Sequence, residues 1–127
     1  MPQTTRAARP GYLAERIGCL YLQCHALKLI ARNFRGPRGE IDLIMVQEAQ
    51  GRERCVVFVE VRLRRHEQFG GPDASISLRK RLRIQRTASL FLQKYPLYAE
   101  YNCRFDALLF TSFFRITWLK DIDSIII

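Results

Sequence analysis

Apolar side chains recur at helical spacing near the start of the chain. After Pro10 and Gly11, apolar residues follow one another at intervals of three or four positions: Leu13, Ile17, Leu20, Cys24 and Leu27. This spacing places their side chains on one face of an α-helix and predicts a helix over residues 12–26. Residues 1–10 lack the pattern and carry two arginines, so we expect a flexible basic arm there.

The pattern then changes to that of β-strands. Residues 29–34, 40–47 and 54–64 are rich in Ile, Leu, Val and Phe, which predicts three strands. The sequence Gly-Pro-Arg-Gly at 36–39 predicts a turn between the first two. A polar connection around Gly51 joins the second and third, so we expect them to form an antiparallel hairpin.

The second half of the chain predicts one more helix and two more strands. The helix begins after Ser75 or Ser77, either of which can cap it, and ends near Lys94 because Pro96 cannot continue it. The apolar residues expected on its core side are Leu78, Leu82, Ala88, Phe91 and Leu92. The remaining segments are two strands and a tail that fits no element, at 103–110, 114–119 and 121–127.

Length and composition agree with one globular domain. The chain has 127 residues, of which 48% are hydrophobic and 26% charged, and these values exclude a disordered or fibrous chain. The order helix, three strands, helix, two strands predicts an α/β domain over residues 11–120, with a mixed sheet of about five strands flanked by helices. No apolar run of membrane-spanning length and no secretory signal is found, so we expect a cytoplasmic protein without membrane contact.

The cysteines form no Cys-x-x-Cys pair and are expected as core thiols: Cys19, Cys24, Cys55 and Cys103.

The charge of the chain points to an anionic partner. Twenty-one Lys and Arg residues against twelve Asp and Glu give a net charge of +9, and all but four of the cations are Arg. The guanidinium group forms forked contacts with phosphate, so nucleic acid is the first partner to consider and an anionic membrane surface the second. The plain alternative is a basic protein that its charge keeps soluble.

The predicted hairpin separates apolar from acidic side chains. Because side chains alternate along a strand, Ile41, Leu43 and Met45 are expected on one face, and Glu40 and Asp42 on the other. The hairpin therefore presents carboxylates within a segment that is otherwise expected to be buried.

The register of the hairpin brings two of these carboxylates together. With the turn centred on Gly51, residues whose numbers add up to 102 face each other, which places Asp42 opposite Glu60 and Glu40 opposite Arg62. Like charges that face each other across two neighbouring strands destabilise the pair unless a cation compensates them. Carboxylate oxygens are ligands that suit Mg²⁺ or Mn²⁺. The alternative is that Glu60 forms an ion pair with one of the many arginines.

Basic residues follow the hairpin and continue into the second helix. Arg79, Arg83 and Arg86 stand at helical spacing and form one stripe. Between residues 62 and 86 eight cations and two acids give +6, whereas residues 39–61 hold five acids and two bases. This charge pattern predicts contacts with backbone phosphates that do not depend on base sequence, although a solvated basic face is the alternative. The residues predicted to bind nucleic acid are Arg64, Arg65, Arg79, Lys80, Arg81, Arg83 and Arg86.

The order of these motifs resembles that of the YraN-like family of bacterial proteins. The resemblance covers residues 11–119 and rests on Ala14-Glu15, Arg32-Asn33-Phe34-Arg35, Gly39-Glu40-Ile41-Asp42-Leu43-Ile44, Val57-Phe58-Val59-Glu60-Val61-Arg62, Phe69-Gly70, Lys80 and Arg104-Phe105-Asp106. The pattern in turn resembles the restriction-endonuclease-like superfamily, whose nucleases cleave phosphodiesters with a metal held by Asp and Glu/Asp-x-Lys.

The resemblance implies a role for four residues. Asp42 and Glu60 would be the metal-binding carboxylates, and Glu15 would be a further acidic contributor from the first helix. Arg62 occupies the position of the active-site Lys. Arginine keeps the positive charge but is effectively never deprotonated, so this exchange preserves phosphate binding more readily than activation of water.

Three functions follow from these expectations. The first is a metal-dependent nuclease acting on DNA, more readily than RNA, with branched or flapped substrates. The second is a nucleic-acid-binding module without catalysis, which Arg62 motivates. The third is a protein-interaction domain whose basic face meets an acidic partner, or a homodimer seated on the apolar residues 125–127.

Overall fold

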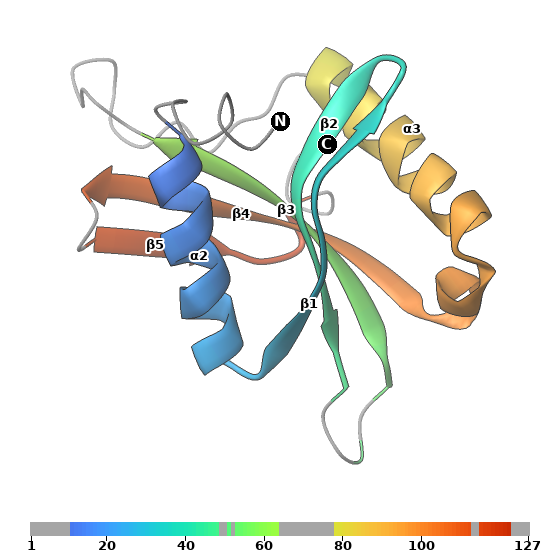
Figure 1. Cartoon of the computed structure of the whole chain (residues 1–127), viewed down its shortest axis with the longest axis horizontal. Coiled ribbons are helices and arrows are strands. Elements are labelled where there is room, and N and C mark those ends of the chain that lie inside the picture. The colour runs from blue at the N-terminus through green and yellow to red at the C-terminus, as the bar shows by residue number, and fades with distance from the viewer. Residues whose placement is uncertain (1–10, 49–50, 52, 64–77, 113–114, 123–127) are drawn as a thin grey trace, which may run out of the picture.

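The described part of the chain folds into a five-stranded sheet with one α-helix on each face (Figure 1). The computed structural model describes residues 11–48, 51, 53–63, 78–112 and 115–122. In chain order the elements are α2 (Tyr12–Cys24), β1 (Leu27–Gly36), β2 (Gly39–Gln47), β3 (Cys55–Leu63), α3 (Leu78–Lys94), the 3₁₀ helix η1 (Pro96–Glu100), β4 (Asn102–Ser112) and β5 (Arg115–Leu119). The predicted order of helix, three strands, helix and two strands is confirmed.

The sheet is mixed. Its strands lie in the order β1-β2-β3-β4-β5; β3 and β4 run parallel, and the other neighbours run antiparallel. A parallel pair needs a crossover connection, and α3 lies in the segment that connects β3 to β4. The mixed α/β architecture expected from the sequence is thereby confirmed.

Two apolar clusters fill the space between the sheet and its helices. The cluster under α2 contains Ala14, Cys19, Leu22, Leu27, Leu43, Met45, Val57, Val59, Leu108 and Phe110. The cluster under α3 contains Ile41, Ile44, Val56, Phe58, Ile84, Ala88 and Phe91. Gly18 allows α2 to approach the sheet closely, because a Cβ atom there would lie 2.9 Å from Cδ1 of Leu108.

The register predicted for the hairpin is correct, and one prediction about its faces is wrong. The pairs run from Gln47 with Cys55 to Leu43 with Val59, and their numbers add up to 102. Ile41, however, packs in the cluster under α3, whereas Leu43 and Met45 pack under α2. The change of face falls between Leu43 and Ile41, where the pairing of β2 with β3 ends.

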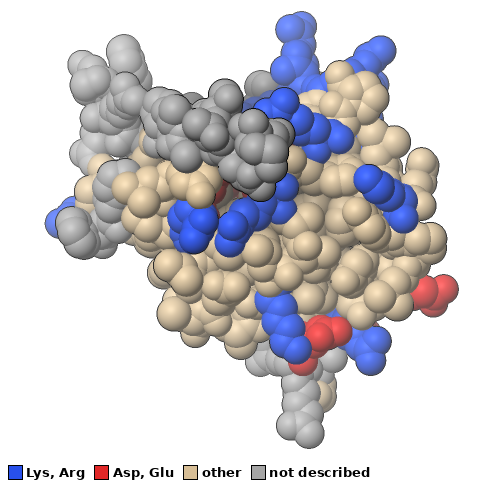
Figure 2. Space-filling view, in the orientation of Figure 1, with Lys and Arg blue, Asp and Glu red and all other residues tan. Residues whose placement is uncertain are grey.

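The core face of α3 also differs from the prediction. Leu78 and Leu82 are 62% and 42% exposed, and the buried residues are Ile84, Thr87, Ala88 and Phe91. Residues in a helix are separated by about 100°, so Leu82 points about 200° away from Ile84. The two leucines therefore lie on the solvent side with the basic residues. Figure 2 shows Lys and Arg side chains gathered over α3 and the neighbouring β1–β2 turn.

The cysteines occupy more varied positions than the sequence predicts. Cys19 is buried, but Cys55 is half-buried and Cys24 and Cys103 are exposed. Cys24 is the last residue of α2 and Cys103 lies at the start of β4, where these elements leave the core.

The predictions for the basic arm, for Ser75 and Ser77, and for the tail beyond Ile122 concern residues outside the described part of the chain. Neither described helix has the length and apolar composition needed to cross a bilayer.

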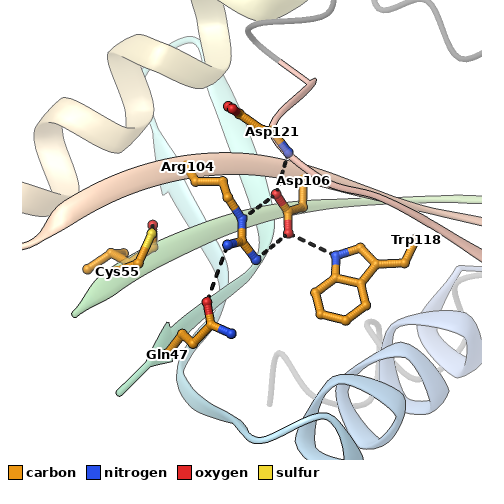
Figure 3. A network of polar contacts seen from close by, with 7 residues as sticks. Gln47, Cys55, Arg104, Asp106, Trp118 and Asp121 are labelled. Atoms are coloured by element: carbon orange, nitrogen blue, oxygen red, sulfur yellow. Dashed lines mark hydrogen bonds and ion pairs between the residues drawn. The ribbon is translucent and has the colours of Figure 1, made fainter. Parts of the chain in front are cut away.

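A buried carboxylate joins the last two strands (Figure 3). Asp106 is fully buried and accepts hydrogen bonds from Nε of Arg104 at 2.9 Å, Nη2 of Arg104 at 3.1 Å, Nε1 of Trp118 at 2.8 Å and the backbone N–H of Asp121 at 2.9 Å. Arg104 also donates from Nη1 to Gln47. Asp106 thus connects β4, β5, the segment after β5 and the end of β2.

We expect Asp106→Ala to lower the free energy of unfolding by about 3 kcal/mol or more, the range for removing one partner of a buried ion pair. The loss arises because Arg104 keeps its charge, and the N–H groups of Trp118 and Asp121 lose their acceptor. Urea unfolding measures the change. The control is Glu100→Ala on the exposed η1, which should change stability by less than about 0.5 kcal/mol. A loss below about 1 kcal/mol for Asp106→Ala would contradict the assignment.

Candidate functional site

Three carboxylates converge at the edge of the α2 face. Glu15 comes from the first turn of α2, and Glu40 and Asp42 come from β2. One carboxylate oxygen from each lies within 4.8 Å of the others. Glu15 is buried, and the other two are half-buried. An oxygen-only set of this size is the kind of donor group that Mg²⁺ and Mn²⁺ prefer.

Asn33 holds two of the carboxylates in place. Its side-chain amide donates one hydrogen bond to Oε1 of Glu15 at 3.2 Å and another to Oε2 of Glu40 at 3.0 Å. Asn33 is buried in β1 and has a φ of 49°, in the left-handed region that asparagine tolerates better than most residues. Glu40 also accepts a hydrogen bond from Nε of Arg35 at 3.0 Å. The predicted pairing of Glu40 with Arg62 is not observed, because the pairing between β2 and β3 ends at Leu43 and Val59. Glu40 instead accepts hydrogen bonds from Asn33 and Arg35.

Asp42 lies where the β2–β3 pairing ends. The last backbone pair is Leu43 with Val59, and one step further Oδ2 of Asp42 accepts the backbone N–H of Val61 at 2.8 Å. The carboxylate thus takes the place of a backbone acceptor for β3. This side-chain contact lets the two strands part at the site while the half-buried N–H group of Val61 keeps a partner.

The surroundings of Asp42 disfavour its charged form. Burial is the main cause that raises its pKa from 3.8 to about 8, and the negative charge of Glu60 is the second. The hydrogen bond from Val61 acts in the opposite direction, and the charges of Glu15 and Glu40 raise the pKa further. A bound cation would reverse this balance, because its charge favours the ionised carboxylate.

Glu60 joins the site from β3. It is 9% exposed, and its charge acts on Asp42, but the group of oxygens within 4.8 Å consists of Glu15, Glu40 and Asp42. Oε2 of Glu60 lies 2.6 Å from Nζ of Lys80, at the start of α3. The alternative in which Glu60 pairs with a cation is therefore observed, with a lysine in place of the expected arginine.

The basic residues predicted from the sequence are divided among different places. Arg62 is half-buried on β3, two positions after Glu60 and paired in the sheet with Leu109. Arg64 and Arg65 lie outside the described residues. On α3, Lys80 and Arg81 are half-buried, and Arg79, Arg83 and Arg86 are exposed.

Sequence reasoning missed two residues near the site. Alternation correctly predicts that Glu40 and Asp42 share a face, but the predicted pairing of Glu40 with Arg62 leaves Glu40 out of the metal site. Arg38 was read only as part of a turn. The structure places it with the exposed arginines of α3. No local signal identifies Arg38, because its neighbours come from a helix forty residues further along the chain.

Comparison with known proteins places the chain among bacterial relatives. The model of the uncharacterised protein family UPF0102 matches residues 14–110, which include α3, all but the first two residues of α2, and the whole carboxylate cluster. A UPF0102 protein of Coxiella burnetii is 41% identical over 111 residues, covering 87% of this chain and 88% of the relative. One from Halorhodospira halophila is 43% identical over 122 residues, covering 94% and 93%. One from Pseudomonas putida is 47% identical over 100 residues, covering 79% and 77%.

These relatives match the chain over most of their own length, and the family model spans the elements that build the site. The resemblance to the YraN-like family is confirmed at this level, and the chain belongs to the UPF0102 family.

Proposed function

We propose that the chain is a metal-dependent phosphodiesterase of nucleic acids with a restriction-endonuclease-like core. The observation that carries this proposal is the convergence of Glu15, Glu40 and Asp42 around Asn33, with Glu60 beside them. The three carboxylates and the raised pKa of Asp42 fit a divalent cation, which relieves their mutual repulsion. Mg²⁺ or Mn²⁺ held there by these residues would lower the pKa of a bound water and provide hydroxide near neutral pH.

The cations around the cluster have a separate role. Arg62 lies two positions along β3 from Glu60, and Lys80 reaches Glu60 from α3. These two positive charges next to a carboxylate cluster suit a phosphate group, which needs positive charge on its own oxygens. The exposed arginines of α3 would then hold the neighbouring phosphates of the strand. DNA, in branched or flapped form, is the proposed substrate, and the cytoplasm is the proposed location.

One specific residue favours a second function. Arg62 stands where the resemblance implies a lysine, and a guanidinium binds phosphate well but does not release a proton near neutral pH. The second candidate is therefore a binding module that holds nucleic acid and does not cleave it.

Metal binding is expected to stabilise the protein. At a Mn²⁺ concentration about 100 times the dissociation constant, the free energy of unfolding should rise by about 2.7 kcal/mol. Asp42→Asn and Glu40→Gln should each remove most of this gain, because each takes one charge from the ligand set. Thermal unfolding with and without Mn²⁺ measures it. Glu48→Gln, an exposed carboxylate at the other end of the hairpin, is the control and should keep the full gain. If Glu60→Gln removes the gain and Glu40→Gln does not, the ligands are Asp42 and Glu60.

The raised pKa of Asp42 predicts the pH dependence of stability in the metal-free protein. Between pH 3.8 and about 8 the folded state keeps a proton that the unfolded state has lost, so stability falls as pH rises through this window. The contribution of this one group is at most about 1.4 kcal/mol per pH unit. Asp42→Asn keeps an acceptor for the N–H of Val61 and cannot ionise, so its stability relative to wild type should increase from pH 5 to pH 8. Urea unfolding in EDTA measures the difference, and parallel profiles would contradict the shift.

Cleavage distinguishes the two candidate functions. With Mn²⁺ and labelled flapped, four-way, duplex and single-stranded DNA, the wild-type protein should produce cut strands, and Asp42→Asn should lower the rate by about 100-fold or more. Glu48→Gln serves again as control. Cutting that is unchanged in Asp42→Asn and Glu60→Gln would contradict the site. Tight binding without cutting by wild type, with cutting gained in Arg62→Lys, would favour the binding module.

A further inference from the structure

An open groove runs between the β1–β2 turn and the outer side of α3. It consists of two adjoining cavities of about 750 and 330 Å³, which share Arg38 of the turn and Arg86 of α3 in their linings. Glycines allow the turn to lie this close to the helix. A Cβ atom at Gly39 would be 3.3 Å from Cβ of Arg83, and one at Gly36 would be 3.0 Å from Cδ1 of Leu90.

The groove is basic. Four arginines line it, Arg38 from the turn and Arg79, Arg83 and Arg86 from α3, and none of the described residues in its lining is acidic. In Figure 2 Lys and Arg side chains lie over α3 and the turn, among others spread across the same face. Guanidinium groups drawn from two elements around one hollow suit a ligand that carries several phosphates in a row.

The groove also has apolar walls. Leu78, Leu82 and Leu90 are 62%, 42% and 36% exposed, and they alternate with the arginines along its length. A duplex keeps its bases stacked inside and presents phosphates to a surface, so it leaves such leucines without a partner. An unpaired strand presents phosphates together with base and sugar faces, which can contact leucines and the planes of arginines.

We propose that this groove binds an unpaired nucleic-acid strand, with its phosphates on the four arginines and its bases or sugars against the three leucines. This inference rests on the proposed nucleic-acid function and adds to it the form of the ligand and its path. From Leu78 to Leu90 the helix spans about 18 Å, which corresponds to the low end of the ~4–16 nucleotides that single-strand sites cover. Arg38, which lines the groove, is two residues along the chain from Glu40 of the carboxylate cluster.

The test is binding to a fluorescein-labelled twelve-nucleotide oligo-dT and to a duplex of the same length. Anisotropy is measured in EDTA, so that cleavage plays no part, over a series of salt concentrations. We expect wild type to bind the single strand at least about tenfold more tightly than the duplex. Arg38→Ala and Arg86→Ala should each weaken that binding about 5- to 10-fold and reduce the slope of log affinity against log salt by about 0.7.

A leucine variant and a distant arginine complete the design. Leu82→Ala should weaken binding to oligo-dT a few-fold and leave the salt slope unchanged, because it removes an uncharged contact. The matched control is Arg115→Ala, an exposed arginine on β5, at the opposite edge of the sheet from β1. It should bind as wild type does. Circular dichroism melts confirm that each variant is folded.

Each other result overturns the inference in a recognisable way. Binding by wild type that Arg38→Ala and Arg86→Ala leave unchanged would overturn the groove and leave the proposed function intact. Preference for duplex, with Leu82→Ala neutral, would overturn the unpaired strand. Displacement of oligo-dT by poly-glutamate at equal charge concentration would assign the groove to an acidic protein, and a dimer that Arg38→Ala dissociates would assign it to a second copy. If wild type binds no nucleic acid, the proposed function fails and the inference fails with it.

Discussion

The parallel pairing of β3 with β4 determines where the residues of the candidate site and of the groove lie. Parallel neighbours cannot be joined by a tight turn, so the chain has to cross a face of the sheet between them, and α3 belongs to that crossing. Burial of Ile84, Ala88 and Phe91 fixes the rotation of α3 on the sheet. This rotation brings Lys80 to Glu60 and Arg83 against Gly39. The position of Lys80 at the carboxylate site and that of the arginines lining the groove thus both follow from the packing of α3 on the sheet.

The carboxylate cluster is an arrangement that folding alone does not favour. Burying the ionised form of Asp42 beside Glu60, Glu15 and Glu40 costs free energy. The raised pKa of Asp42 reflects that cost. The chain offsets part of it with donors: the amide of Asn33, the N–H of Val61, Arg35 on Glu40 and Lys80 on Glu60. Asp106 shows the opposite case. Its four hydrogen bonds and its paired Arg104 satisfy the carboxylate, and they give it a structural role in joining β4 and β5.

The sequence predicted what depends on local pattern and failed where two distant elements decide. The register of the hairpin follows from its turn, so the approach of Asp42 to β3 could be derived before the structure. The face of Ile41 could not be derived from alternation, which places it with Leu43, whereas Ile41 packs under α3. Leu78 and Leu82 were assigned to the core because their helical spacing is correct, but spacing alone does not fix which side of α3 meets the sheet. The contact of Asn33 with Glu15 joins two elements, and no spacing in either predicts it.

The β1–β2 turn links the two proposed sites physically. Within six residues it carries Arg35, which holds Glu40, and Arg38, which lines the groove, and its glycines lie against Arg83 and Leu90. A Cβ atom at Gly39 would lie 3.3 Å from Cβ of Arg83, and Glu40 is bonded directly to Gly39, so any shift of the turn there also moves a carboxylate of the cluster. The spacing between turn and helix therefore sets both the width of the groove and the position of a cluster carboxylate. A strand in the proposed groove would therefore contact the same turn that carries Glu40 of the cluster.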